Sequence, residues 1–280
     1  MVNRKQIRIC VASNAGGSGK TTSSVHLAYG LAKKGYKVTI IELDVSGSLM
    51  TFTGLDEPNP DYSLATIFKP EFRGEYPLIP VWESGVSGVT VIQGGEPVQR
   101  AIREINRSDR GVYILKDRLD DYPLDADVVI LDTPASLETM TPIGLAASTH
   151  ILSPIKPETK DVEGFAGFIR WYNQQVKNLR LQPKPEFIGF IPIRVRLDMA
   201  MHRNILGIDS KGKPQKGLTP AETLPGVIQS MGIHCFPFVR ETSYYVNASF
   251  HRLPVGLYRP KIDAAKDFDA VVDAVIELLF

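Results

Sequence analysis

Residues 14–22 of the chain read Asn-Ala-Gly-Gly-Ser-Gly-Lys-Thr-Thr, and this stretch decides the fold. The apolar residues 7–12 before it predict a strand, and residues 23–32 after it predict a helix. A glycine-rich turn between a strand and a helix is the setting of a phosphate-binding loop, in which backbone N–H groups and the positive end of the helix surround an anion. We therefore expect a nucleoside triphosphate to bind here. Its contacts would come from Gly16, Gly17, Ser18, Gly19, Lys20, Thr21 and Thr22.

Two side chains of this loop have chemical roles of their own. Lys20 would reach the terminal phosphates, and the Thr21 hydroxyl would be a ligand of Mg²⁺. The general pattern of such loops has a glycine where Asn14 stands, whereas this chain has the adjacent pair Gly16 and Gly17. The alternative is a glycine-rich turn that opens a helix by chance. The strand, the Lys-Thr-Thr sequence and the helix together favour phosphate binding.

The composition sets the class of protein. With 280 residues, 43% of them hydrophobic, the chain can bury a substantial core, and we expect a single α/β domain over residues 1–280. The formal net charge of +1 means that any nucleic-acid-binding surface must be a local patch. Cys10 and Cys235 fall in predicted strands and indicate neither a disulfide framework nor a metal site. No apolar run approaches the roughly 20 residues that span a bilayer, so we expect a cytoplasmic protein.

The pattern along the chain alternates strands with helices. This alternation predicts a doubly wound, mostly parallel sheet flanked by helices, with ligands at the carboxyl ends of the strands. Residues 54–88 are expected to form an irregular excursion, and residues 207–218 a basic, mobile loop. Beyond the first strand and helix, the sequence predicts strands at 37–43, 89–93, 127–132, 150–154, 187–191 and 233–237, and helices at 136–147, 158–178, 219–231 and 263–280.

Several segments together resemble the ParA/MinD family of deviant Walker-box ATPases, and the plasmid-partition ParA branch in particular. The resemblance covers nearly the whole chain, and it implies a P-loop NTPase fold with a deviant Walker A loop, ATP and Mg²⁺ as cofactors, and ATP hydrolysis. Besides the glycine-rich loop, it rests on Asp44-Val45-Ser46-Gly47-Ser48, on residues 129–137 (Val-Ile-Leu-Asp-Thr-Pro-Ala-Ser-Leu), on Pro154-Ile155-Lys156-Pro157-Glu158 and on Phe238-Val239-Arg240.

Further site residues follow from these segments. Asp44 ends a predicted strand beside the glycine-rich loop, where a carboxylate can orient or deprotonate the attacking water and contribute to the Mg²⁺ site. Asp132 ends an apolar strand and would hold Mg²⁺ together with Thr21. The alternatives are a turn residue for Asp44 and a helix cap for Asp132. The resemblance also implies that Arg194 and Pro237 belong to the nucleotide site, with Arg194 near the adenine. A solvated surface arginine is the alternative for Arg194.

One residue departs from the family pattern. Ala15 stands where the family carries a signature lysine that crosses the interface of an ATP-sandwich dimer and stabilises negative charge on the partner's phosphates. Lys156, held in an extended loop between two prolines, is our candidate replacement and is counted among the catalytic residues. A solvated loop lysine is the alternative. Relatives of the McdA branch, which position carboxysomes, also lack this lysine. Less favoured replacements are Lys160, Arg194, Arg196 and Arg203.

The resemblance leaves open which surface the protein binds. Relatives of the MinD type bind membranes through a basic C-terminal helix, whereas residues 263–280 form an acidic amphipathic pattern that anionic lipid would repel. ParA-type relatives bind DNA without sequence preference, through phosphate contacts. We expect no membrane partner and a DNA-binding set, with ordinary solvated charge as its alternative. The set is Arg240, Arg252, Arg259 and Lys261, supplemented by Lys211, Lys213 and Lys216.

The sequence thus predicts an ATP-dependent positioning or partition ATPase. It would form an ATP-dependent homodimer, associate with the nucleoid and segregate a plasmid or other cargo with a ParB-like or McdB-like adaptor. One alternative is an ATP-binding switch or scaffold with little turnover, which Ala15 favours. Another is an McdA-type carboxysome-positioning ATPase. A nitrogenase-type reductase is disfavoured because the two cysteines lie in predicted strands, and a membrane-positioning ATPase is disfavoured by the acidic tail.

Overall fold

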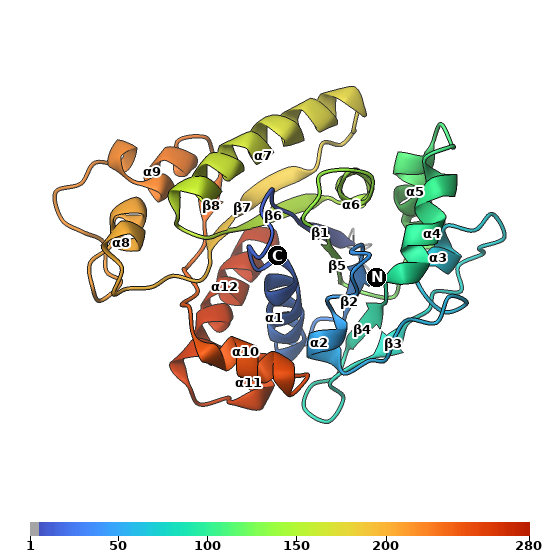
Figure 1. Cartoon of the computed structure of the whole chain (residues 1–280), viewed down its shortest axis with the longest axis horizontal. Coiled ribbons are helices and arrows are strands. Elements are labelled where there is room, and N and C mark those ends of the chain that lie inside the picture. The colour runs from blue at the N-terminus through green and yellow to red at the C-terminus, as the bar shows by residue number, and fades with distance from the viewer. Residues whose placement is uncertain (1–5) are drawn as a thin grey trace.

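The computed structural model describes residues 6–280, so the first five residues of the expected domain 1–280 lie outside the described part. An eight-stranded sheet runs through this part in the order β3-β4-β2-β5-β1-β6-β7-β8 (Figure 1). All neighbouring strands are parallel except β3 and β4. The predicted doubly wound, mostly parallel sheet is therefore confirmed. The strands are β1 (Ile7–Val11), β2 (Val38–Glu42), β3 (Ile79–Pro80), β4 (Val89–Ile92), β5 (Val128–Asp132), β6 (His150–Ile155), β7 (Glu186–Pro192) and β8 (His234–Cys235).

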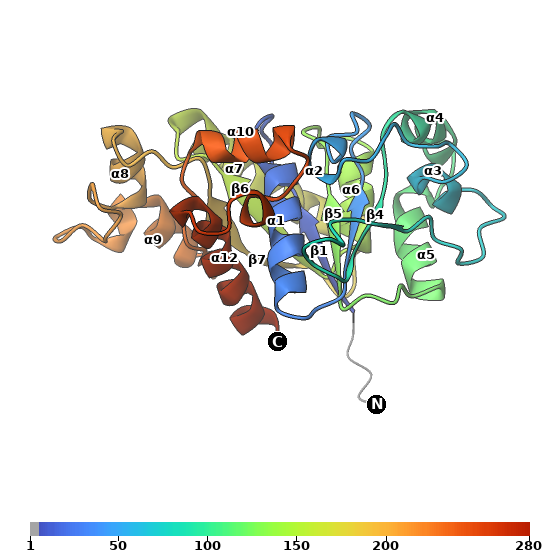
Figure 2. The same ribbon diagram turned by 90° about the horizontal axis from the view of Figure 1, so that it is seen from below.

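The central strands are buried on both faces, as their unbroken apolar sequences require. Along β1, Ile9 and Val11 pack on one face and Cys10 packs on the other. The first face is covered by α1 (Lys20–Lys33) and α12 (Asp263–Leu279), and α10 (Ser243–Phe250) and α11 (Val255–Tyr258) pack on the outer side of these two helices (Figures 1 and 2). The second is covered by α5 (Ile114–Asp121), α6 (Met140–Ala147) and α7 (Thr159–Asn178).

The acidic C-terminal helix packs on the helix that follows the glycine-rich loop. Gly30 of α1 lets Val272 of α12 approach so closely that a Cβ at residue 30 would lie 2.4 Å from a Val272 methyl. The acidic face of α12 is paired with lysines of the α1 C-terminus, Lys33 with Asp269 at 3.1 Å and Lys34 with Asp273 at 2.5 Å. The predicted helix over 263–280 is therefore part of the fold's own packing.

Several element boundaries differ from the sequence prediction. The helix expected over 219–231 is a 3₁₀ turn at Pro220–Glu222 followed by α9 (Leu224–Gln229). It divides at Thr223, whose hydroxyl caps α9 by accepting the Gly226 N–H at 3.2 Å, while Thr219 and Glu222 form a separate capping box. The helix expected from residue 136 begins only at Met140. The sequence did not predict α2 (Met50–Thr53), α4 (Glu96–Ile105), α5, α8 (Ala200–Leu206), α10 or α11.

The segment expected to be an irregular excursion, residues 54–88, carries both α3 (Leu64–Ile67) and the antiparallel edge strand β3. Tyr62 is exposed, and the Trp82 ring N–H donates to the Phe52 carbonyl at 2.9 Å. The apolar side chains of this segment that are buried in the core are Leu64, Ile67, Phe68, Phe72, Val81 and Trp82. The segment is thus attached to the sheet both by the short strand β3 and by its buried apolar side chains. No helix among residues 6–280 is long and apolar enough to cross a bilayer.

Candidate nucleotide site

The loops that carry the predicted site residues meet at one edge of the sheet. In parallel strands the carboxyl ends lie together, and here those of β2, β5, β1, β6 and β7 are neighbours. The glycine-rich loop follows the central strand β1, Asp132 ends β5, and Asp44 follows β2. Figure 2 shows α2 and α10 at this end of the molecule, opposite both chain termini. The topology therefore collects residues from distant parts of the sequence around the start of α1.

The glycine-rich loop adopts a conformation that its glycines permit. Gly17 and Gly19 have φ angles of +68° and +82°, in the left-handed region where side chains are strained. Gly19 has a second constraint, because a Cβ there would lie 2.6 Å from the Ile193 side chain. The backbone N–H groups at the start of α1 are left without side-chain caps. A curled loop with free N–H groups at a helix start is an anion-binding concavity.

Lys20 lies folded over this loop. Its ammonium donates to the Ala15 carbonyl at 2.9 Å and lies 3.4–3.5 Å from the hydroxyls of Ser18 and Ser13. Burial lowers the pKa of Lys20, and the charges of Asp132 and Asp44 oppose that shift. All of its hydrogen-bond partners are neutral oxygens, so a phosphate oxygen would be a stronger partner.

Asp132 is fully buried and bound to α1 through two hydroxyls. Thr21 donates to one carboxylate oxygen at 2.8 Å, and Ser24 donates to the other at 2.7 Å. Burial raises the pKa of Asp132 to about 6, against the lowering effect of these hydrogen bonds and of Lys20. Ser24 was not predicted, although its position three residues after Thr21 puts it on the same side of α1.

A second buried carboxylate, Glu42, holds the loop that carries Asp44. It accepts the backbone N–H of Leu49 at 2.8 Å and that of Gly94 at 3.0 Å. Burial raises the pKa of Glu42 to about 7, and the negative charges of Asp132 and Asp44 contribute. The Asp44 carboxylate accepts the Ser46 N–H at 2.9 Å and faces the cavity. Glu42 was not predicted, because its role depends on the distant Gly94.

This donor set fits Mg²⁺. The ion prefers oxygen ligands and is usually bound through one or two carboxylates together with substrate phosphates. The Thr21 hydroxyl and the Asp132 carboxylate are already in contact, and Asp44 lines the same cavity. A divalent cation would also relieve the repulsion that these carboxylates exert on one another.

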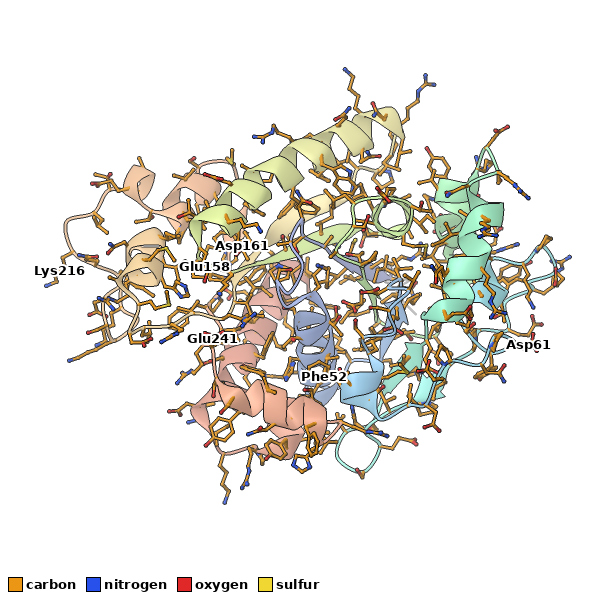
Figure 3. All side chains as sticks on the ribbon, viewed as in Figure 1. Phe52, Asp61, Glu158, Asp161, Lys216 and Glu241 are labelled. Carbon is orange, nitrogen blue, oxygen red and sulfur yellow. The ribbon has the colours of Figure 1, made fainter. Side chains whose placement is uncertain are left out.

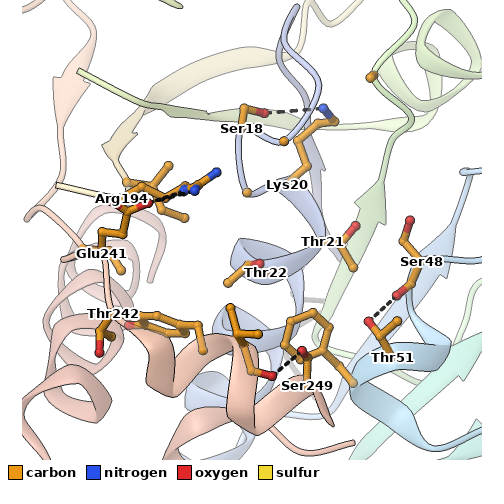
Figure 4. A pocket seen from close by; sticks show the side chains of 18 of the residues that line it. Ser18, Lys20, Thr21, Thr22, Ser48, Thr51, Arg194, Glu241, Thr242 and Ser249 are labelled. Atoms are coloured by element: carbon orange, nitrogen blue, oxygen red, sulfur yellow. Dashed lines mark hydrogen bonds and ion pairs between the residues drawn. The ribbon is translucent and has the colours of Figure 1, made fainter. Parts of the chain in front are cut away.

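The cavity at this edge has a volume of about 560 Å³. In Figure 4, Lys20 and Ser18 lie at one end, Arg194 and Glu241 form one side, and Ser48 and Thr51 lie opposite. Arg194, at a φ of +57°, donates to one Glu241 carboxylate oxygen at 2.8 and 3.0 Å. The C-terminal wall is completed by Val239, Arg240, Glu241 and Thr242 together with Tyr245, Val246 and Ser249 of α10. Of the residues predicted for the nucleotide site, Arg194 lines this wall and Pro237 does not. Arg240, which was predicted to bind DNA, lies in the wall instead, and the contribution of α10 was not predicted.

Comparison with known sequences settles the family. Residues 6–184 match the family described as an AAA domain, which is more than half of the chain. The chromosome-partitioning ATPase Soj of Thermus thermophilus is 31% identical over 202 residues, covering 68% of this chain and 70% of Soj. The chain belongs to the ParA/MinD family of Walker-box ATPases. A ParA family protein of Chlamydia trachomatis is 27% identical to this ParA/MinD-family chain, over 97% of it and 98% of that relative.

Solved structures share the fold of this ParA/MinD-family ATPase. An ATP complex of a Cyanothece McdA variant superposes with a TM-score of 0.76 at 20% identity, covering 96% of both chains. A putative plasmid partition protein of Borrelia burgdorferi bound to AMPPNP superposes with a TM-score of 0.74 at 19% identity, covering 98% of this chain and 99% of that one. The P-loop fold inferred from the sequence is therefore confirmed over nearly the whole chain.

Not all predicted residues of the ParA/MinD-family site lie around the cavity. Among the residues that the structure describes, residues 17–22, Asp44, Arg194 and Arg240 line the cavity. The predicted residues Gly16, Asp132, Lys156 and Pro237 do not line it. Asp132 nevertheless contacts Thr21 directly. Pro237 is exposed beside β8. Lys156, in the β6–α7 loop, is paired with Glu158 at 2.5 Å.

The cations predicted to bind DNA have different surroundings. Arg240 donates to the Asp267 carboxylate of α12 at 2.7 and 2.9 Å and lines the nucleotide cavity. Arg252, Arg259 and Lys261 are exposed on the segment from α10 to α12. Arg259 also stacks on the Tyr258 ring, 5.3 Å from its centre. The supplementary lysines belong to the loop between α8 and α9, at whose outer end Figure 3 shows Lys216.

Proposed function

We propose that this chain is a slow, partner-stimulated ATPase that forms an ATP-sandwich dimer, binds DNA without sequence preference and positions a plasmid or other cargo with an adaptor. The proposal depends mainly on one observation: the glycine-rich loop, Thr21, Asp132 and Asp44 lie together at one edge of the sheet. Partition ATPases such as Soj are among its relatives, which supports the cargo class.

The residues at the cavity have separate roles in this proposal. The loop from Gly16 to Thr22 holds the triphosphate, with Lys20 on its terminal phosphates. Thr21 and Asp132, with Asp44 nearby, hold Mg²⁺, which neutralises phosphate charge when bound. Asp44 also orients the attacking water, since it faces the cavity from a loop that Glu42 fixes. Arg194 and Pro237 would act on the adenine side, as the family resemblance implies.

Lys156 supplies the cation that Ala15 lacks. Residues 153–155, which immediately precede it, share a small crevice with Asn14 and Ala15 of the glycine-rich loop. Lys156 therefore emerges next to the position of the missing lysine. In a face-to-face dimer its ammonium would stabilise the negative charge that develops on the partner's triphosphate.

Non-specific DNA binding is assigned to Arg252, Arg259 and Lys261, because they are exposed on one continuous segment. Arg240 contributes less, since its guanidinium is already held by Asp267. Dimerisation would double this modest set of cations and make binding depend on nucleotide. The proposed location is the nucleoid in the cytoplasm, with a ParB-like or McdB-like adaptor as stimulating partner and no membrane partner.

A DNA titration tests the proposal. Binding to a random duplex should require Mg·ATP, be weaker with ADP or without nucleotide, and weaken steeply with salt. Replacing Arg252, Arg259 and Lys261 together by alanine should reduce affinity at least about tenfold, while the matched replacement of Lys211, Lys213 and Lys216 should have a smaller effect. Equal DNA binding with and without ATP would reject the proposal.

A second candidate function is an ATP-binding switch with little turnover. It is favoured by Ala15 and by the ion pair that engages Lys156. Phosphate release measured with saturating DNA and adaptor distinguishes the two functions. Turnover that stays at background with both partners present would support the switch.

A further inference from the structure

The carboxyl end of β6 lies against the glycine-rich loop. Asn14 and Ala15 on one side and Pro154 and Ile155, the last residues of β6, on the other line a common crevice. The start of α7 belongs to the same contact, because a Cβ at Gly164 would lie 4.0 Å from the Asn14 carbonyl. The loop of Lys156, Pro157 and Glu158 is therefore flanked on both sides by segments that lie next to the position of Ala15.

Within this loop, the Lys156 ammonium is already engaged. It lies 2.5 Å from the Glu158 Oε1 atom, and the two side chains are only 23% and 32% exposed. Figure 3 labels Glu158 at the beginning of α7. The two residues are separated by Pro157, which limits the conformations of the loop. In this arrangement the positive charge of Lys156 is neutralised within its own chain.

His202, in α8, faces the same carboxylate. It is fully buried, and its Nδ1 atom accepts the Arg196 backbone N–H at 3.0 Å, so Nε2 carries the proton of the neutral ring. That Nε2 atom has no hydrogen-bond partner and lies 3.8 Å from Glu158 Oε1. Burial lowers the pKa of His202, which keeps the ring neutral. A buried donor without a partner costs free energy unless a second arrangement satisfies it.

We propose that Glu158 is a latch with two positions, which holds Lys156 in the nucleotide-free chain and moves to the His202 Nε2–H when Lys156 turns to the partner's triphosphate. This inference rests on the proposed role of Lys156 in the dimer. Glu158 and His202 are then positioning residues, since neither touches the nucleotide.

The physical advantage lies in what happens to Glu158 after Lys156 leaves. A carboxylate left unpaired beside an incoming triphosphate would repel it and would lose its hydrogen bond. The His202 N–H needs only a shift of about 1 Å to reach hydrogen-bond distance from 3.8 Å. The latch thus keeps Lys156 unavailable until a stronger anion competes for it.

Lysine acetylation followed by mass spectrometry tests the closed position in the nucleotide-free protein. In the Glu158→Gln variant, Lys156 should react about fivefold faster than in the wild type, relative to exposed Lys177 as internal reference. The matched control is Glu163→Gln, which removes the same charge from an exposed position of α7. An unchanged Lys156 rate, or an equal increase in both variants, would overturn the latch.

Sedimentation with Mg·ATP tests whether release of Lys156 from Glu158 strengthens the dimer. Glu158→Gln should strengthen the dimer about fivefold. In a Lys156→Ala background the same substitution should leave dimer affinity unchanged. If Glu158→Gln acted only by altering the local structure, its effect would persist in the Lys156→Ala background. Faster labelling without any stronger dimer would instead reject the proposed role of Lys156 and leave the closed contact established.

A separate substitution tests the second position of the latch, in which Glu158 accepts the His202 Nε2–H. His202→Asn keeps an acceptor for the Arg196 N–H and removes the Nε2 donor. Lys156 should then be labelled at the wild-type rate, while the dimer weakens by about 2- to 10-fold, the range of one net hydrogen bond. An undiminished dimer would overturn the part of the proposal that concerns His202.

Discussion

The phosphate end of the cavity and its C-terminal wall are built in different ways. At the phosphate end, Lys20 and Asp132 are buried, and their partners come from residues close to the glycine-rich loop or at the end of a neighbouring strand. At the C-terminal wall, the Arg194–Glu241 pair is 48% and 30% exposed. Buried polar contacts contribute more free energy than exposed ion pairs, and they tolerate fewer substitutions. Substitutions should therefore act strongly at the first region and weakly at the second.

The largest expected effect on nucleotide affinity is that of Lys20→Ala. The variant loses charge-assisted contacts to the terminal phosphates, which corresponds to about 3 kcal/mol or more and to at least about a 100-fold loss of Mg·ATP affinity. Isothermal titration calorimetry measures the change, with exposed Lys177→Ala as the matched control. Wild-type affinity in Lys20→Ala would show that the phosphate end is misassigned.

Asp44→Ala should separate hydrolysis from binding. Removing the group that orients water should reduce turnover by about 10²- to 10⁴-fold, and Mg·ATP affinity should change by less than about tenfold, because Lys20 and Asp132 remain. Single-turnover phosphate release, with DNA and adaptor present, gives the rate. A variant that hydrolyses ATP at the wild-type rate would remove Asp44 from the catalytic role.

The contact between α1 and the C-terminal segment should depend on pH through His26. Its ring accepts the Val255 N–H at 3.0 Å, and burial lowers its pKa to about 4. The unfolded chain, with a histidine pKa near 6.5, binds a proton that the folded chain excludes. Stability is therefore lost as the pH falls from about 6.5 toward 4, by about 2 kcal/mol at pH 5.

Urea unfolding of the wild type and of His26→Gln, at pH 7 and pH 5, isolates this contribution. Glutamine keeps an acceptor for Val255 and does not titrate in this range. The difference in unfolding free energy between the two proteins should shrink by about 2 kcal/mol on acidification. A constant difference would contradict the neutral, buried state of His26.

The smallest effect is expected at the C-terminal wall. Glu241→Gln removes a negative charge beside the cavity and frees Arg194, so Mg·ATP should bind only about 2- to 5-fold more tightly. Glu277→Gln, exposed on α12 and outside the described cavity lining, is the matched control. A loss of affinity as large as that of Lys20→Ala would abolish the distinction between the two regions.

The same contrast explains what the sequence could and could not predict. The positions of the glycine-rich loop, Asp44 and Asp132 at one edge of the sheet were predictable, because a short local pattern fixes a strand end, a turn and a helix start. Glu42 was missed because its partners Leu49 and Gly94 belong to other loops. The wall from Glu241 to Ser249 was missed because α10 has no strong apolar period and is held by tertiary packing. The pairing of Arg240 with Asp267 joins residues that only the fold brings together.

The most direct measurement is the sedimentation of Asp44→Ala with Mg·ATP, with Mg·ADP and without nucleotide, since this variant should bind ATP without consuming it. The account predicts a dimer with Mg·ATP and monomers in the other two conditions. A monomer under saturating Mg·ATP, or a dimer that forms equally without nucleotide, would contradict the claim that the filled phosphate cradle joins two copies of the chain.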